Sequence, residues 1–352
     1  MALFRKKARF AREASAAPGQ GIESFWTWWS EDGAARTADA VAARDPRRMV
    51  EELSRRVNAV HPGLAWELAA GTDGAEHLLV VSPEGNPELR ATARRWLRAA
   101  PPPDETWEFA DARQPVADLD DIRLGIDGNE VGFGEMVVTA RRVGYRFDVT
   151  VHHPLFADLP PETQLQITYL ALDAAVGETD TETWIGDVAP ASVAPLDAFP
   201  LALLRGLVDQ LVAETTDEYG EPTWVLLRGD GPSGPVLASA QVPLCPTAAP
   251  ELDLHVAVVV PFAERTEEGF PGDASLQQLR DLEDHLAARV GDSGRLVAHE
   301  TSAGVRTLHF YVDSTSPSAG VLEGAVRGWT EGRVSVSDEP DPAWDAVRHL
   351  RA

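Results

Sequence analysis

Four polar side chains in the C-terminal third are the best candidates for a binding face. On the apolar strand around Phe310, strand alternation places Thr307, His309 and Tyr311 on the side away from their apolar neighbours. His255 lies on another predicted strand and can join them. Imidazole and phenol groups on an uncovered sheet face can contact a partner or a ligand. The same four residues can instead form the polar side of the sheet, or be buried against the N-terminal domain.

Neighbouring histidines suggest a metal site, but their spacing argues against one. His152 and His153 lie near Asp158 and Glu162. Adjacent residues of a strand point to opposite faces, so both imidazoles cannot bind one ion without distortion. The only cysteine, Cys245, rules out an intramolecular disulfide and a cysteine-cluster metal site. The sequence therefore predicts no metal-binding residues.

Motifs for nucleotide binding or catalysis are equally weak. Gly229, Gly231 and Gly234 fit the G-x-G-x-x-G spacing of a dinucleotide loop. Such a loop needs a helix after it, whose N-terminus faces the pyrophosphate. Here a strand-like run follows, so a hairpin turn is the better interpretation. The chain has no Walker lysine motif, no H-E-x-x-H and no G-x-S-x-G, so we predict no catalytic residues and no cofactor.

The charge of the chain limits its partners. The 352 residues include 56 Asp and Glu against 31 Lys and Arg, which gives a formal net charge of −25 at pH 7. Such a surface repels phosphate backbones and anionic lipids, so we expect no nucleic-acid partner and no stable membrane anchoring. A protein with a basic surface is the favoured partner. Because the chain lacks an apolar run of about 20 residues and a secretory signal, we expect it in the cytoplasm.

The elements that must position these residues divide into three regions. Residues 1–22 combine a basic cluster with an Ala/Ser/Pro/Gly stretch and predict a disordered tail. Residues 23–245 predict an N-terminal α+β domain, in which an αββαβ unit is followed by further strands and helices. A Pro/Ala-rich linker at 243–250 then leads to a C-terminal domain, residues 246–352.

The C-terminal domain has the clearest pattern. A strand at 255–261 is followed by a leucine-striped helix at 275–290, two strands, a helix and a last strand. This βαββαβ order is typical of the ferredoxin-like arrangement, an antiparallel sheet with both helices on one side. Its strand–strand–helix part, residues 294–329, matches the architecture of residues 63–96, so the N-terminal domain is expected to contain a related unit. The predicted fold class is α+β with two domains.

Several segments of this domain carry a resemblance to a known family. They are Gly269-Phe270-Pro271 before the helix, Thr301-Ser302-Ala303-Gly304 between strands, and the closing Asp341-Pro342-Ala343-Trp344. The C-terminal domain resembles the bacterial family catalogued as domain of unknown function 695. The resemblance implies a ferredoxin-like fold and a bacterial cytoplasmic protein, and it implies no catalytic residue. Related domains resemble regulators that inhibit ribonuclease E.

Two functions from different classes remain open. The favoured hypothesis is a non-enzymatic acidic protein that binds another protein, as a regulatory or inhibitor-type module. The alternative is an enzyme or small-ligand-binding protein that uses the cleft between the domains. The polar groups available to that alternative are His61, His152, His153, Glu178 and Asp187. Among these five residues, no nucleophile with a partner base can be identified from the sequence.

Overall fold

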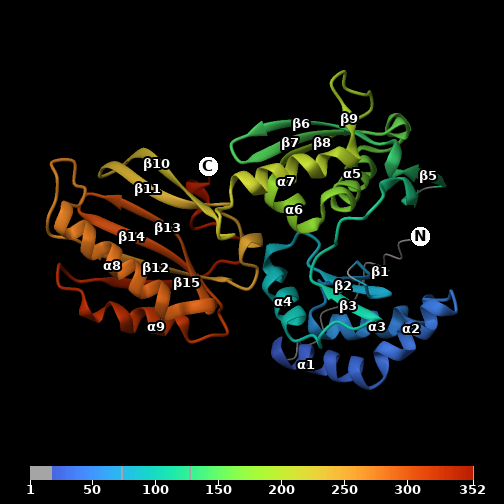
Figure 1. The fold of residues 1–352 in the computed structure, drawn as a ribbon, viewed down its shortest axis with the longest axis horizontal. Coiled ribbons are helices and arrows are strands. Elements are labelled where there is room, and N and C mark those ends of the chain that lie inside the picture. The colour runs from blue at the N-terminus through green and yellow to red at the C-terminus, as the bar shows by residue number, and fades with distance from the viewer. Residues whose placement is uncertain (1–17, 73, 127, 352) are drawn as a thin grey trace. The chain divides into compact units, whose positions relative to one another are not determined.

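The fold is known from a computed structural model, which describes residues 18–72, 74–126 and 128–351 (Figure 1). Helices and sheets occur in both halves of the chain, so the α+β prediction is confirmed. The described residues form two compact units that divide between Leu211 and Val212. Within those residues no helix combines the length and the apolar character that a membrane span requires.

The first unit opens with helices that pack on a small sheet. Its leading elements are α1 (Pro18–Trp28), a π-helical turn (Trp29–Gly33), α2 (Ala34–Ala42), α3 (Arg47–Val60), β1 (Ala65–Ala70), β2 (His77–Ser82), α4 (Pro87–Arg98) and β3 (Trp107–Ala110). Strand β1 pairs antiparallel with β2, and β2 pairs parallel with β3. The predicted αββαβ order is therefore present from α3 to β3.

An aromatic cluster holds this layer together. The rings of Trp26 and Trp96 lie 4.6 Å apart, and the indole nitrogen of Trp26 donates a 2.8 Å hydrogen bond to the carbonyl of Trp96. Ile22 is buried in the same cluster. The predicted disordered tail is therefore wrong at its end, because residues 18–22 form the start of α1 and bury an apolar side chain. The rest of that tail, residues 1–17, lies outside the described residues.

The first unit continues with a second sheet. Its elements are β4 (Arg123–Ile126), β5 (Asn129–Gly132), β6 (Val137–Val143), β7 (Arg146–His152), α5 (Pro161–Val176), α6 (Glu178–Trp184), β8 (Ile185–Ala191), β9 (Phe199–Pro200) and α7 (Leu204–Glu214). The strands run in the order β8-β7-β6-β9, with β4 and β5 as a separate hairpin. Thr183 and Trp184 are buried at the end of the short helix α6.

The second unit is built around one six-stranded sheet. Its elements are β10 (Thr223–Gly231), β11 (Gly234–Val242), β12 (Leu254–Pro261), α8 (Asp273–Val290), β13 (Gly294–Ser302), β14 (Val305–Val312), α9 (Ser318–Ala325) and β15 (Ser335–Pro340). The strand order is β10-β11-β13-β14-β12-β15. The predicted βαββαβ order is present from β12 to β15, and the ferredoxin-like assignment stays our interpretation of it.

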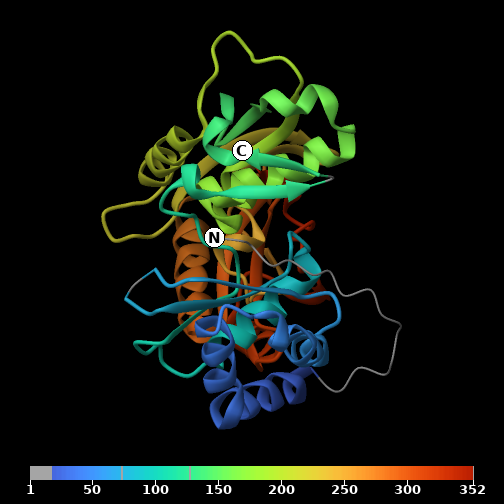
Figure 2. The same ribbon diagram turned by 90° about the vertical axis from the view of Figure 1, so that its right-hand side faces the viewer.

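The central strands of this sheet are covered on both faces. Helices α8 and α9 cover one face, where Leu279, Leu286 and Leu322 pack on apolar residues of β12 and β14. Helix α8 runs alongside the strands in both views (Figure 1, Figure 2). The chain's own last residues, 341–350, cover the opposite face, and we call this segment the C-terminal strap. Trp344 of the strap is almost completely buried.

The β10–β11 hairpin belongs to the second unit. Strand β11 pairs with β13, so that Ser239 lies opposite His299. The division between the units therefore comes earlier in the chain than the boundary predicted at 245/246. The reason is the long-range pairing of β11, which makes the hairpin an extension of the C-terminal sheet.

Candidate functional site

The four residues of the predicted binding face do lie together. Pairing of β12 with β14 places His255 opposite Tyr311, and Thr307 and His309 follow on the same face. The structure nevertheless covers them. Tyr311 is completely buried, and His255 and His309 are more than nine-tenths buried, whereas Thr307 is half-buried. A role for these residues in binding a partner stays a prediction.

The C-terminal strap is the cover. The hydroxyl of Tyr311 donates a 2.5 Å hydrogen bond to Oδ2 of Asp341. The ring of Tyr311 stacks on Trp344 at a centroid distance of 4.2 Å, and Trp344 donates from Nε1 to the carbonyl of Leu252 at 2.9 Å. Burial, together with the hydrogen bond to Asp341, raises the pKa of Tyr311. Tyr311 is therefore a neutral anchor for the strap.

A network of three imidazoles and one carboxylate runs beside this anchor. Nε2 of His255 lies 3.0 Å from Nδ1 of His309, whose Nε2 lies 3.0 Å from Oε1 of Glu300. His349 of the strap reaches the same Glu300 oxygen at 3.0 Å. Burial lowers the pKa of His255, and the neighbouring His309 lowers it further. The hydrogen bond from His309 lowers the pKa of Glu300. The network ties the strap to the sheet.

The remaining sequence candidates lie apart from one another. Nδ1 of His152 is 2.8 Å from the carbonyl of Ala191, whereas Nδ1 of His153 accepts from the backbone of Leu155. His61 ends α3, and its Nδ1 accepts from the backbone of Gly63. Asp187 is exposed on β8. Across the described ranges, no group of three or more His, Cys, Asp or Glu side chains is placed to hold a metal ion.

The glycine-rich stretch forms the turn between β10 and β11. Gly231 pairs with Gly234, which has a φ of 123° that favours glycine. A strand follows this turn, so the hairpin prediction is confirmed.

Glu178 is the most deeply placed of the candidate carboxylates. Its two oxygens accept from the hydroxyl of Ser82 at 2.6 and 2.7 Å, and Oε2 accepts from the backbone of Arg113 at 2.9 Å. The guanidinium of Arg113 pairs with Glu67 at 3.0 Å and with Asp173 at 3.3 Å. Burial raises the pKa of Asp173 to about 7, and the charge of Glu178 adds to this effect. The cluster connects the first sheet of this unit to helices α5 and α6.

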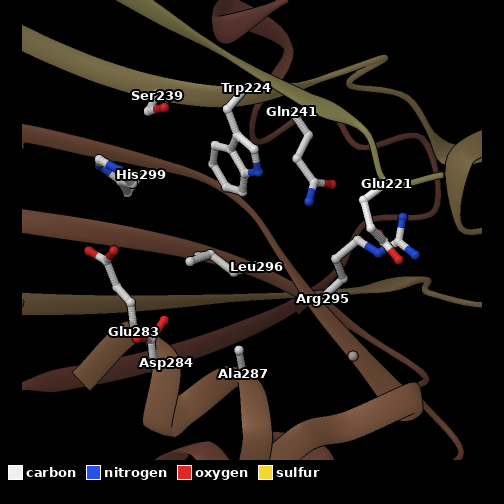
Figure 3. Close-up of a pocket in the computed structure, with 11 residues that line it drawn as sticks. Glu221, Trp224, Ser239, Gln241, Glu283, Asp284, Ala287, Arg295, Leu296 and His299 are labelled. Carbon is white, nitrogen blue, oxygen red and sulfur yellow. The ribbon is translucent and has the colours of Figure 1, made fainter. Parts of the chain in front are cut away.

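A groove in the second unit is the better candidate for binding. It lies where β10 and β11 extend beyond α8, and its volume is about 450 Å³ (Figure 3). We call it the α8 groove. Its lining residues are Glu221, Trp224, Ser239, Gln241, Glu283, Asp284, Ala287, Gly294, Arg295, Leu296 and His299.

The register of the sheet gathers these side chains on one face. Trp224 lies opposite Gln241, and Ser239 lies opposite His299, so residues of three neighbouring strands line the groove. Helix α8 contributes the opposite wall with Glu283 and Asp284 (Figure 3). The helix packs over β12 and β14 and leaves the hairpin uncovered. The groove is therefore bounded by the side of α8 and by the exposed face of the sheet.

Trp224 supplies the aromatic surface of the groove. Its side chain points into the groove in Figure 3, and 42% of the residue is exposed, which is unusual for tryptophan on a strand. Its ring centroid lies 6.3 Å from that of His299. An exposed indole face attracts cations through its quadrupole.

The acidic wall is fixed by a buried arginine. Nη1 of Arg306 donates to Oε1 of Glu283 at 2.8 Å, and its Nε donates to the hydroxyl of Thr301 at 2.9 Å. Burial raises the pKa of Glu283, and the charge of Arg306 opposes this shift. Asp284 is exposed beside it. The groove therefore presents carboxylates across from an indole, with Arg295 and Glu221 pointing toward one another at one end (Figure 3).

His299 does not have the surroundings of a catalytic base. Burial lowers its pKa to about 4, and the charge of Arg306 contributes to the shift. Its buried Nδ1 has no hydrogen-bond partner within the part of the chain that the structure describes. A general base needs a third group that orients it and stabilises its charged form. An arrangement of an indole and carboxylates of this kind can bind a cation.

Comparison with known proteins covers only part of the groove. Residues 244–349 match a family of unknown function, DUF695, which confirms the resemblance identified from the sequence. The match includes α8 and β13, and it excludes the β10–β11 hairpin that carries Trp224. No curated protein and no solved structure matches the chain. These comparisons therefore assign no function to the α8 groove.

Sequence reasoning missed the α8 groove. The hairpin was predicted as part of the N-terminal domain, which separated Trp224 from Glu283 and His299. One signal was available, because alternation along β10 places Trp224 and Leu226 on the same face, and both are exposed. Two large apolar side chains on the open face of a strand indicate a contact surface.

Proposed function

We propose that this protein is a non-catalytic binding module that recognises a basic surface of another protein through the α8 groove. The observation that carries the proposal is Trp224, an exposed indole that faces the carboxylates of α8 across the groove. A lysine or arginine side chain can lie on the indole face and donate to a carboxylate at the same time.

The charge of the whole chain supports the same partner. With a net charge of −25, the protein attracts basic surfaces over a distance set by the salt concentration. Electrostatic attraction of this kind speeds association and selects the partner. It opposes the approach of DNA and RNA, which agrees with a protein partner. Regulation or inhibition of that partner is the function that we assign to the module.

A peptide-binding measurement tests the proposal. Fluorescence anisotropy is measured with two labelled hexapeptides, one alternating arginine with serine and one alternating glutamate with serine, on the full chain. We expect the arginine peptide to bind and its affinity to fall as salt is raised. Trp224→Ala should weaken binding about 5-fold, through loss of the cation–π contact. Asp284→Asn should weaken it about 2- to 5-fold.

Matched controls separate the groove from the general negative charge. Asp281→Asn removes the same charge from an exposed residue of α8 that does not line the groove, and its affinity should stay within about 2-fold. Equal binding of the two peptides would overturn the proposal. The proposal would also be overturned if Trp224→Ala left the affinity for the arginine peptide unchanged. The same holds if Asp281→Asn lowered that affinity as much as Asp284→Asn.

A further inference from the structure

A second cavity lies in the first unit, between the helical layer and the edge of its first sheet. Its volume is about 450 Å³, within the range of roughly 300–1,000 Å³ that is typical of small-molecule sites. We call it the Arg44 pocket. Its lining residues are Val41, Arg44, Pro46, Val50, Trp66, Leu68, Ala69, Ala70, Glu76 and His77, of which seven are apolar.

The pocket exists because α3 covers only part of β1. Leu53 and Val57 of α3 are completely buried, whereas Val50, one turn earlier, is half-buried. On the strand, Trp66 is buried and Leu68 is half-buried. Apolar side chains that remain partly open around a cavity of this size favour an apolar ligand.

Trp66 makes the buried wall of the pocket apolar. Its indole nitrogen donates to the hydroxyl of Ser54 at 3.1 Å, so its one polar group is already used. The polar groups left on the lining are Arg44, Glu76 and His77. The carboxylate of Glu76 lies 3.9 Å from Nε2 of His77 and is three-quarters exposed. Arg44 is the cation that a ligand can use.

The backbone of Arg44 adds a second observation. Its φ of 56° lies in the left-handed region, at the turn that ends α2, where its N–H donates to the carbonyl of Val41 at 2.9 Å. Glycine is the residue that this position favours, because any side chain there adds strain. Arginine is present instead, and it is one of the residues that line the pocket. In the described part of the chain no ion pair holds its guanidinium.

We infer that the Arg44 pocket binds a small molecule with an apolar body and one carboxylate, of the class of medium-chain fatty acids and arylacetic acids. The apolar body packs against Val50, Trp66 and Leu68. The carboxylate pairs with Arg44, whose planar guanidinium matches two carboxylate oxygens. A local cation is necessary for such a ligand, because the protein as a whole repels anions. The inference does not rest on the α8 groove, which is formed by other residues.

Calorimetric titration of the full chain with octanoate, octanol and octylamine tests the inference. The three probes share an apolar chain and differ in the charge of the head group. We expect octanoate to bind at least about 10-fold more tightly than octylamine, as expected for a hydrogen-bonded ion pair. Octanol should fall between them. Equal affinity of octanoate and octylamine, or no binding of octanoate, would overturn the inference.

Three variants assign the binding to this pocket. Arg44→Asn keeps a residue that tolerates the left-handed backbone and removes the charge, so octanoate should bind no better than octanol. Arg48→Gln removes an exposed arginine that pairs with Asp45 outside the pocket, and octanoate binding should not change. Val50→Phe fills the cavity and should abolish binding of all three probes. If octanoate binding survives Arg44→Asn in a folded protein, the assignment is wrong, even where Val50→Phe fails to fold.

Discussion

The ring of Trp224 on β10 lies 6.3 Å from the imidazole of His299 on β13, at an interplanar angle of 31°. Strand β11 lies between these two strands, so the two rings approach each other across β11. Their approach depends on the pairing of β11 with β13, in which Ser239 lies opposite His299. Only a folded β10–β11 hairpin can place the indole over the groove. The α8 groove is therefore a product of long-range pairing.

The charge state of His299 gives the first prediction. Its pKa is about 4, so the imidazole should be neutral from pH 8 down to about pH 5. In the unfolded chain this histidine is protonated near pH 6.5. The free energy of unfolding should therefore fall by up to about 1.4 kcal/mol per pH unit as the pH falls from 6.5 toward 4. Carbon-detected NMR of the imidazole should show flat chemical shifts between pH 8 and 5. A midpoint near pH 6.5 for His299 would refute this account of its surroundings.

The second prediction concerns the C-terminal strap. Trp344→Ala should destabilise the protein by about 3–5 kcal/mol, because it empties a buried site and removes the stacking on Tyr311. Tyr311→Phe should cost about 1 kcal/mol, since Asp341 keeps its backbone donors. Urea unfolding measures both effects. Tyr219→Phe, at an exposed tyrosine of the same unit, is the control and should change nothing.

The third prediction concerns the hairpin. A fragment of residues 215–352 should unfold in a single cooperative transition, because it contains the complete six-stranded sheet. A fragment of residues 251–352 lacks Ala238, Ala240 and Leu244 from the core under the strap. It should be less stable by at least about 2 kcal/mol, or fail to fold. Equal stability of the two fragments would show that the hairpin is not part of this unit.

The fourth prediction uses the buried carboxylate cluster of the first unit. The pKa of Asp173 is raised to about 7, so the folded state holds a proton that the unfolded state releases near pH 4. Stability from this group is complete below about pH 4 and is lost as the pH rises toward 7. In wild type, this group should lower the free energy of unfolding by up to about 1.4 kcal/mol per pH unit in that range, and Asp173→Asn should remove this pH dependence. Urea unfolding of wild type and variant at several pH values measures the difference. Parallel curves would contradict the prediction.

Much of the local structure follows from sequence periodicity. Alternation along β12 and β14 places His255, His309 and Tyr311 on one face, which the strand pairing confirms. The same pattern carries no information on what covers that face. The strap follows the last strand and contains Pro342 and Trp344, whose backbone has a left-handed conformation. Only tertiary contacts such as the stacking of Trp344 on Tyr311 hold the strap over the sheet.

The position of the hairpin could not be predicted for a related reason. Alternation and turn glycines predict that β10 pairs with β11, because these strands adjoin in sequence. The partner of β11 on its other side is β13, which follows the whole of β12 and α8. No local signal selects that partner. The boundary predicted at 245/246 and the missed α8 groove share this cause.

The most direct test of the proposed function is the indole N–H signal of Trp224 in a proton–nitrogen NMR titration with the alternating arginine–serine peptide. Trp224→Phe assigns the signal, and Trp329 and Trp344, which donate to backbone carbonyls of the same unit, serve as internal controls. We predict that the Trp224 signal moves in a saturable, salt-sensitive way while those of Trp329 and Trp344 stay in place. A peptide that binds without moving the Trp224 signal, or a glutamate–serine peptide that moves it equally, would contradict the proposal that the α8 groove binds cations.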